Sequence, residues 1–219
     1  AGSGIVHQEL PHGGAQGRMH GFQLWANLPW ALKMTPPRYQ GIKSADIAEV
    51  IEDDGTKARI ICGNLWGKTG PVDGIAADPQ YVDISVPPGK KKVIPVATEH
   101  HAFAYVFAGS GRFLDASDPY RAPTEWVDPG AAREPLDGHR TGLSAGTDTD
   151  NRSLVLFDRG DNVTVQAGEL GIRFLLASGL PLQEPVAWRG LIVMNTKEEL
   201  RQAYQDLQDD TFLKHGSSQ

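Results

Sequence analysis

Apolar and polar residues alternate along several short segments of the chain, with the period of two that is typical of β-strands. The clearest runs end at turn-forming residues, such as Pro87-Pro88-Gly89 and Gly109-Ser110-Gly111. Strands at this spacing, joined by tight turns, indicate an all-β sandwich or barrel. We predict strands at 56–65, 81–86, 91–97, 101–107, 154–157, 162–166 and 171–177, with a hairpin between 154–157 and 162–166.

The first thirty residues show the same alternation beside candidate chemistry. Phe22 to Asn27 alternates with period two and predicts a strand, and we expect the nearby Trp25 and Trp30 to pack in a core. If residues 5–9 are also extended, His7 and Glu9 project from the same face, since residues two apart in a strand share a face. One imidazole and one carboxylate are half of a common iron site that activates oxygen. A pair of residues is a weak signal, because a salt bridge on a surface strand has the same spacing.

One helix is predicted, at the C-terminal end. Thr196 and Glu199 have the spacing of a capping box, which satisfies the free amides at a helix start. An apolar stripe with helical spacing then follows, and it must lie against another surface. Its members are Leu200, Ala203, Tyr204 and Leu207.

Other segments are less regular. Residues 33–43 contain adjacent prolines and are expected to be extended, and Ser44 to Val50 is expected to form one helical turn capped by Ser44. Cys62 is expected to be a small core residue. Residues 115–152, rich in Asp, Pro, Gly and Thr, show no sustained period and predict a surface insertion.

Composition narrows the class of protein. The 219 residues carry a formal charge of -6, which disfavours direct binding to nucleic acid. A single cysteine permits no disulfide within the chain and fits a reducing compartment, so we expect a cytoplasmic protein. No apolar stretch is long enough to span a membrane, and no secretory leader is visible. The chain starts at Ala1 without an initiating Met, so we expect a fragment.

Three long segments resemble the pirin family. AGSGIVHQE is similar to the pirin segment that carries the last two metal ligands, and GFQLWANLPWALKMTPPRYQ resembles the run that follows it. TEHHAFAYVFAGSGRF resembles a strand and turn of the second barrel. RFLLASGLPLQEPVAWRGLIVMNTKEELRQAYQDLQDDTF is similar to the pirin C-terminus. The resemblance covers nearly all of the chain except Asp115 to Arg152.

The resemblance implies a fold and its domains. Pirins are bicupins of two β-barrels with a C-terminal α-helix, and here the first barrel would be truncated. We expect residues 1–55 to be the remainder of the N-terminal cupin domain and 56–195 to be the C-terminal cupin domain, with the insertion at 115–152. Residues 196–219 would form the helix and tail packed on the N-terminal domain.

The resemblance also implies a metal site. Pirins hold one metal, usually Fe(II) or another divalent ion, with three His and one Glu. Only His7 and Glu9 match that set here, because the His-Pro-His-type motif that supplies the other two histidines precedes the segment opening this chain. His12, His20, His100 and His101 are poor replacements, since two lie in a loop and two are adjacent in the second barrel.

Two functions follow from the resemblance. One is a dioxygenase of the quercetin 2,3-dioxygenase type, in which a flavonol-like molecule is the substrate and Glu9 is the catalytic base as well as a ligand. The other is a non-enzymatic, iron-dependent regulator that binds a protein partner. Either would be a monomer with an incomplete metal site in the chain as written.

Overall fold

The computed structural model describes residues 2–6, 17, 20–114, 120–121 and 149–214. It contains two 3-10 helices, η1 (Trp30–Leu32) and η2 (Ser44–Asp46), and one α-helix, α1 (Lys197–Gln208). The strands are β1 (Ala48–Ile51), β2 (Lys57–Cys62), β3 (Asn64–Leu65), β4 (Lys68–Thr69), β5 (Gln80–Val86), β6 (Lys91–Pro95), β7 (His101–Leu114), β8 (Tyr120–Arg121), β9 (Thr149–Asp150), β10 (Ser153–Phe157), β11 (Asn162–Gly179), β12 (Ala187–Arg189) and β13 (Ile192–Met194). The predicted class, mostly β with one C-terminal helix, is confirmed. No helix within the described ranges has the length and apolar character needed to cross a membrane.

The chain divides into two compact units. Residues 42–181 form the larger unit, and residues 1–41 with 182–219 form the smaller one. The domain boundaries expected from the sequence were placed elsewhere, at residues 55 and 195, and they stay a prediction. Strand β1, which lies before residue 55, pairs with β2 inside the larger unit.

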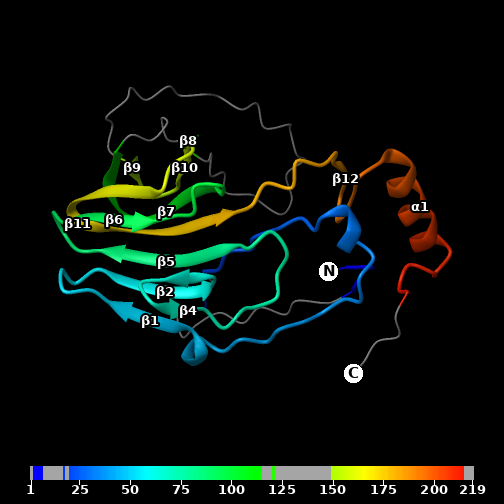
Figure 1. Cartoon of the computed structure of the whole chain (residues 1–219), viewed down its shortest axis with the longest axis horizontal. Coiled ribbons are helices and arrows are strands. Elements are labelled where there is room, and N and C mark those ends of the chain that lie inside the picture. The colour runs from blue at the N-terminus through cyan, green and yellow to red at the C-terminus, as the bar shows by residue number, and fades with distance from the viewer. Residues whose placement is uncertain (1, 7–16, 18–19, 115–119, 122–148, 215–219) are drawn as a thin grey trace. The chain divides into compact units, whose positions relative to one another are not determined.

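A nine-stranded antiparallel sheet dominates the larger unit, in the order β1-β2-β5-β11-β7-β10-β8, with β6 beside β11 and β9 beside β7 (Figure 1). Strands β3 and β4 form a separate two-stranded sheet in the same unit. The longest strand, β11, pairs with β7 along both of its halves. Its first half also pairs with β6 and its second half with β5. Because every one of these pairings includes β11, this strand connects the two halves of the sheet.

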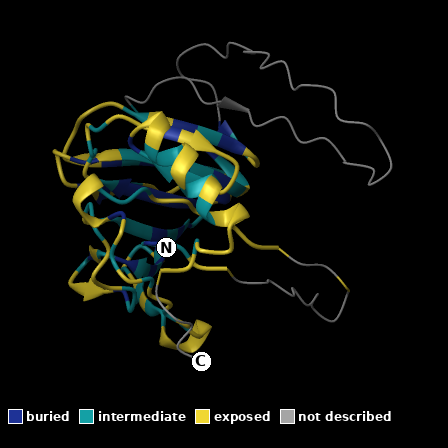
Figure 2. Ribbon diagram, turned by 90° about the vertical axis from the view of Figure 1, so that its right-hand side faces the viewer, coloured by how far each residue is buried: buried dark blue, intermediate teal, exposed yellow. Residues whose placement is uncertain are grey.

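The core of the larger unit is apolar and is formed by strands in which every second side chain is buried. Alternate residues of β2 and β5 are buried, and the residues between them are only partly covered. Figure 2 shows this alternation as dark and lighter segments along the strands. Aromatic rings pack in this core, where the ring of Phe174 contacts that of Phe113 edge-on with centroids 5.1 Å apart. The largest fully buried apolar side chains are Phe174, Ile60, Ile84, Ile94 and Leu176.

Several local predictions are wrong. The strand expected to end near residue 107 continues to Leu114, and β10 pairs with β7 and β8 instead of forming a hairpin with β11. Residues 22–27 form no strand among the described parts of the chain. The turn at Ser44 is a short 3-10 helix whose N-cap is Lys43, and residues 48–51 are a strand. Cys62 is buried as expected.

Glycine explains why β7 does not stop where the sequence pattern predicts a turn. Gly109 has a φ of 69°, and a Cβ atom there would clash with the carbonyl oxygen of Gly171 on β11. The register between the two strands shifts between Ala167 and Ile172, beside this contact. The glycine therefore permits a close approach at a β-bulge, and the strand passes through it.

Replacement of Gly109 is expected to destabilise the larger unit. Gly109→Ala forces an alanine into the left-handed region, at a cost of about 1–2 kcal/mol, and adds a backbone clash. Gly160→Ala is the matched control, because a Cβ at Gly160 would have no neighbour closer than 3.8 Å. Urea unfolding should show a lower free energy of unfolding for the first variant only. Equal stability of the two variants would contradict the close approach.

Candidate functional site

The two predicted metal ligands, His7 and Glu9, lie outside the described residues. The chain just before them is held in place within the smaller unit. The amide of Ser3 donates to the carbonyl oxygen of Thr35 at 2.8 Å, and Gly4 lies against the ring of Phe212. Segments from both ends of the chain therefore contact the residues that lead into His7.

The described histidines do not gather into a metal site. His20 is exposed and its ring lies 5.1 Å from that of Phe22. His100 is buried, with Nδ1 3.2 Å from the Ser178 hydroxyl, and His101 is exposed. Within the parts of the chain that the structure describes, no group of three or more His, Cys, Asp or Glu side chains could hold an ion.

The apolar core cluster of the larger unit offers no metal ligands, although polar side chains such as His100 and Ser178 are buried elsewhere in the unit. The buried side chains that form its core cluster are all aliphatic or aromatic, and they include Val82, Val106 and Leu176. Such an interior excludes water and metal ions alike, since a charge there would be unpaired. This apolar cluster is therefore no candidate metal site.

A hydrogen-bonded network joins the two segments of the smaller unit. The carboxylate of Glu184 accepts from the amide of Trp30 at 2.7 Å and from the Asn195 side chain at 3.0 Å. Glu199 accepts from the indole of Trp30 at 3.3 Å and from the amide of Thr196 at 2.8 Å. The hydrogen bond from the Thr196 amide lowers the pKa of Glu199. Both carboxylates thus fix the turn at Trp30, which follows the predicted ligand stretch in sequence.

Lys33 is the buried cation of this unit. Its ammonium group donates to Asn27 Oδ1 at 2.7 Å and to the carbonyl oxygen of Leu28 at 3.0 Å. Burial lowers the pKa of Lys33, while the charges of Glu184 and Glu199 act in the opposite direction. No pattern in the sequence indicates this role, because Lys33 stands at the start of a segment expected only to be extended.

The apolar side chains of the smaller unit are largely uncovered. Trp25 and Trp30, expected in a core, are 51% and 64% exposed, and the prediction is wrong for both. The ring of Trp25 lies 6.5 Å from that of Trp188, which is also exposed. Among the described residues of this unit only Ser3, Lys33, Ala187 and Asn195 are buried. Polar bonds, more than an apolar core, hold this unit together.

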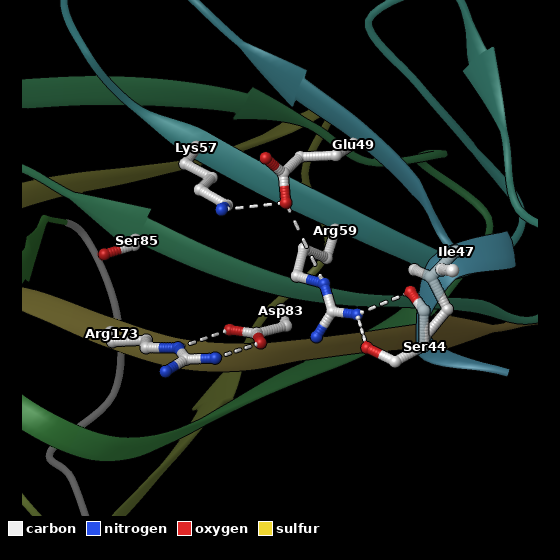
Figure 3. Close-up of a pocket in the computed structure, with 9 residues that line it drawn as sticks. Ser44, Ile47, Glu49, Lys57, Arg59, Asp83, Ser85 and Arg173 are labelled. Atoms are coloured by element: carbon white, nitrogen blue, oxygen red, sulfur yellow. Dashed lines mark hydrogen bonds and ion pairs between the residues drawn. The ribbon is translucent and has the colours of Figure 1, made fainter.

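The larger unit carries a polar hollow on the outer face of its sheet. The hollow has a volume of about 580 Å³ and is lined by residues of β1, β2, β5 and β11 with η2 at one side (Figure 3). Lys57 donates to Glu49 at 2.8 Å, and Arg173 forms a two-pronged pair with Asp83 at 2.9 and 2.6 Å. Residues from four strands therefore converge on one charged surface.

Comparison with known proteins identifies the relatives of the chain. Residues 135–213 match the family model described as the pirin C-terminal cupin domain. A pirin-like protein of Caulobacter vibrioides is 37% identical over 97% of the chain, and the chain spans 65% of its length. A protein of Thermoplasma acidophilum with the provisional name quercetin 2,3-dioxygenase is 28% identical over 98% of the chain and 77% of its own length.

A solved structure supports the fold. The quercetin 2,3-dioxygenase of Acinetobacter baumannii superposes with a TM-score of 0.68 and 24% identity, covering 89% of this chain and 56% of that one. The chain also spans 61% and 60% of the lengths of pirin-like proteins from Solanum lycopersicum and Arabidopsis thaliana. It therefore corresponds to somewhat less than two thirds of these relatives.

The capping box predicted at Thr196 is present and suggests a test of the network. The Thr196 hydroxyl accepts from the amide of Glu199 at 3.1 Å, while the Glu199 carboxylate binds the amides of Asn195 and Thr196. Thr196→Ala should cost about 1 kcal/mol of helix stability and speed amide exchange in α1. Gln208→Ala, at the exposed last residue of α1, is the control. Unchanged exchange in Thr196→Ala would mean that the cap does not stabilise α1.

Proposed function

Because the chain belongs to the pirin family, we propose that it is a metal-binding cupin protein with ring-opening dioxygenase activity of the quercetin 2,3-dioxygenase type. The observation that carries the proposal is the His7-Gln8-Glu9 spacing within a segment similar to the pirin ligand segment. The provisional name of the Thermoplasma relative supports the same reaction class. The substrate would be a flavonol-like molecule.

The two residues fit the proposed metal by type but not by number. A neutral imidazole nitrogen and a carboxylate oxygen are ligands that Fe(II) takes in oxygenases. Stable sites use three or four protein ligands, and the described part of the chain adds no group of three. We infer that a complete site needs at least one ligand besides His7 and Glu9.

His7 and Glu9 would have separate roles. A bound divalent metal supplies Lewis acidity and open positions for substrate oxygen. His7 must stay neutral to offer its ring nitrogen as a ligand. Glu9 would accept the proton of the flavonol hydroxyl, because a carboxylate within hydrogen-bond reach of that group is a competent general base.

A non-enzymatic role is the second candidate, and the exposed aromatic residues favour it. Trp25, Trp30 and Trp188 are all more than half exposed. Trp25 and Trp188 are neighbours, and adjacent exposed aromatic side chains can form a contact surface for another protein. In this role the metal would sense redox state, and a protein partner would cover the aromatic surface.

Metal retention tests the ligand count. After anaerobic loading with Fe(II) and desalting, the 219-residue chain is expected to retain far less than one iron per chain, because two ligands hold a labile ion poorly. Elemental analysis measures the ratio. One tightly held iron per chain would show that this chain completes the site by itself.

Activity tests the enzyme proposal in a form of the protein that carries a complete set of metal ligands. In that form, Glu9→Gln is expected to lower flavonol turnover by about 10²-fold or more. His101→Gln, at an exposed histidine of β7, should change neither iron content nor turnover. Full iron content without flavonol consumption would overturn the enzyme proposal and favour the regulator.

A further inference from the structure

Three side chains in the polar hollow form a row across neighbouring strands. Ser85 on β5 lies opposite Lys57 on β2 and opposite Arg173 on β11. Neighbouring strands are about 4.8 Å apart, so two cationic side chains rise on either side of one hydroxyl. Figure 3 shows Ser85 between Lys57 and Arg173 on the same face of the sheet.

The next row holds these cations in position. Glu49 accepts from Lys57 at 2.8 Å, and its carboxylate lies 4.0 Å from Arg59 Nε. Asp83 binds Nε and Nη2 of Arg173, and this hydrogen bonding raises the pKa of Arg173. The Arg173 guanidinium also lies over the ring of Phe107, 4.9 Å from its centroid. Lys57 and Arg173 are thus oriented before any ligand arrives.

A wall of the hollow is formed by η2 and the residue after it. Arg59 Nη2 donates to the carbonyl oxygen of Ser44 at 3.1 Å and to its hydroxyl at 2.7 Å. This contact fixes η2 at the edge of the sheet, where Ala45 and Ile47 also line the hollow. Their apolar side chains can contact carbon atoms of a ligand.

The hollow has an excess positive charge and hydrogen-bonding groups that no described residue engages. Lys57, Arg59 and Arg173 face only Glu49 and Asp83, which leaves one positive charge in a chain of net charge -6. Within the described residues, the Ser85 hydroxyl has no hydrogen-bond partner, and Asp83 leaves Nη1 of Arg173 unengaged.

We propose that this hollow binds a small organic anion through a single carboxylate or phosphate group. Lys57 Nζ, the Ser85 hydroxyl and Arg173 Nη1 donate to its oxygen atoms, and Ala45 and Ile47 contact its carbon skeleton. One negative charge balances the excess positive charge of the hollow. Its volume of about 580 Å³ lies within the range of small-molecule sites. The site is independent of His7 and Glu9.

Titration with inorganic phosphate and with acetate tests the site on the 219-residue chain. At constant ionic strength set by sodium chloride, amide shifts of β2, β5 and β11 should saturate with at least one of the two anions. The anion that binds more tightly identifies the ligand group as phosphate or carboxylate. Shifts that grow linearly, without saturation, for both anions would overturn the proposal.

Three variants locate the binding. Lys57→Gln should weaken binding by about ten-fold, which corresponds to one charge-assisted hydrogen bond. Ser85→Ala should weaken it several-fold, and it removes no internal hydrogen bond, so the fold is retained. Lys91→Gln, on β6, removes the same charge outside the hollow and should leave the affinity unchanged. Equal weakening by Lys57→Gln and Lys91→Gln would mean that the anion responds to the overall charge of the protein, which would overturn the proposed site. An unchanged affinity in Ser85→Ala would also overturn it.

Discussion

The close approach of β7 and β11 at Gly109 and Gly171 is the constraint on which the larger unit depends. Strand β11 pairs with β6 and with the end of β7 through its first half, and with β5 and the start of β7 through its second half. A side chain at Gly109 would push the strands apart at the point where the register shifts. Strand β11 can pair with both halves of the sheet because the bulge beside Gly109 lets it continue from one half into the other.

The sequence predicted the parts of this fold that depend on local patterns. Alternation located the longer strands β2, β5, β6, β7, β10 and β11, and the Thr196–Glu199 spacing located the helix, because each signal lies within a few residues. The pairing of β10 was missed because its partner is β7, about fifty residues earlier, and nothing in the local pattern specifies that partner. The end of β7 was missed because glycine reads as a turn even where its role is to permit close contact.

The same limit applies to the candidate site. Spacing and the resemblance to the pirin ligand segment predicted His7 and Glu9, which lie outside the described residues. The bonds that fix the neighbouring turn join Trp30 to Glu184 and Glu199, more than 150 residues away in sequence. Lys33 stands in a segment for which the sequence predicts only an extended conformation, yet it is 5% exposed. Residues whose partners are so distant carry no sequence signal, because alternation and capping describe only near neighbours.

The two units are stabilised by different forces, and this difference bears on function. Apolar burial stabilises the larger unit, so its surface can vary without loss of the fold, and the charged hollow lies on that surface. In the smaller unit, three of the four buried described residues are polar, and hydrogen bonds to carboxylates join its segments. Such a unit opens locally at lower free energy than an apolar core does. Because the free energy of metal binding adds to the stability of the unit that supplies the ligands, the proposed site at His7 and Glu9 would stabilise this unit.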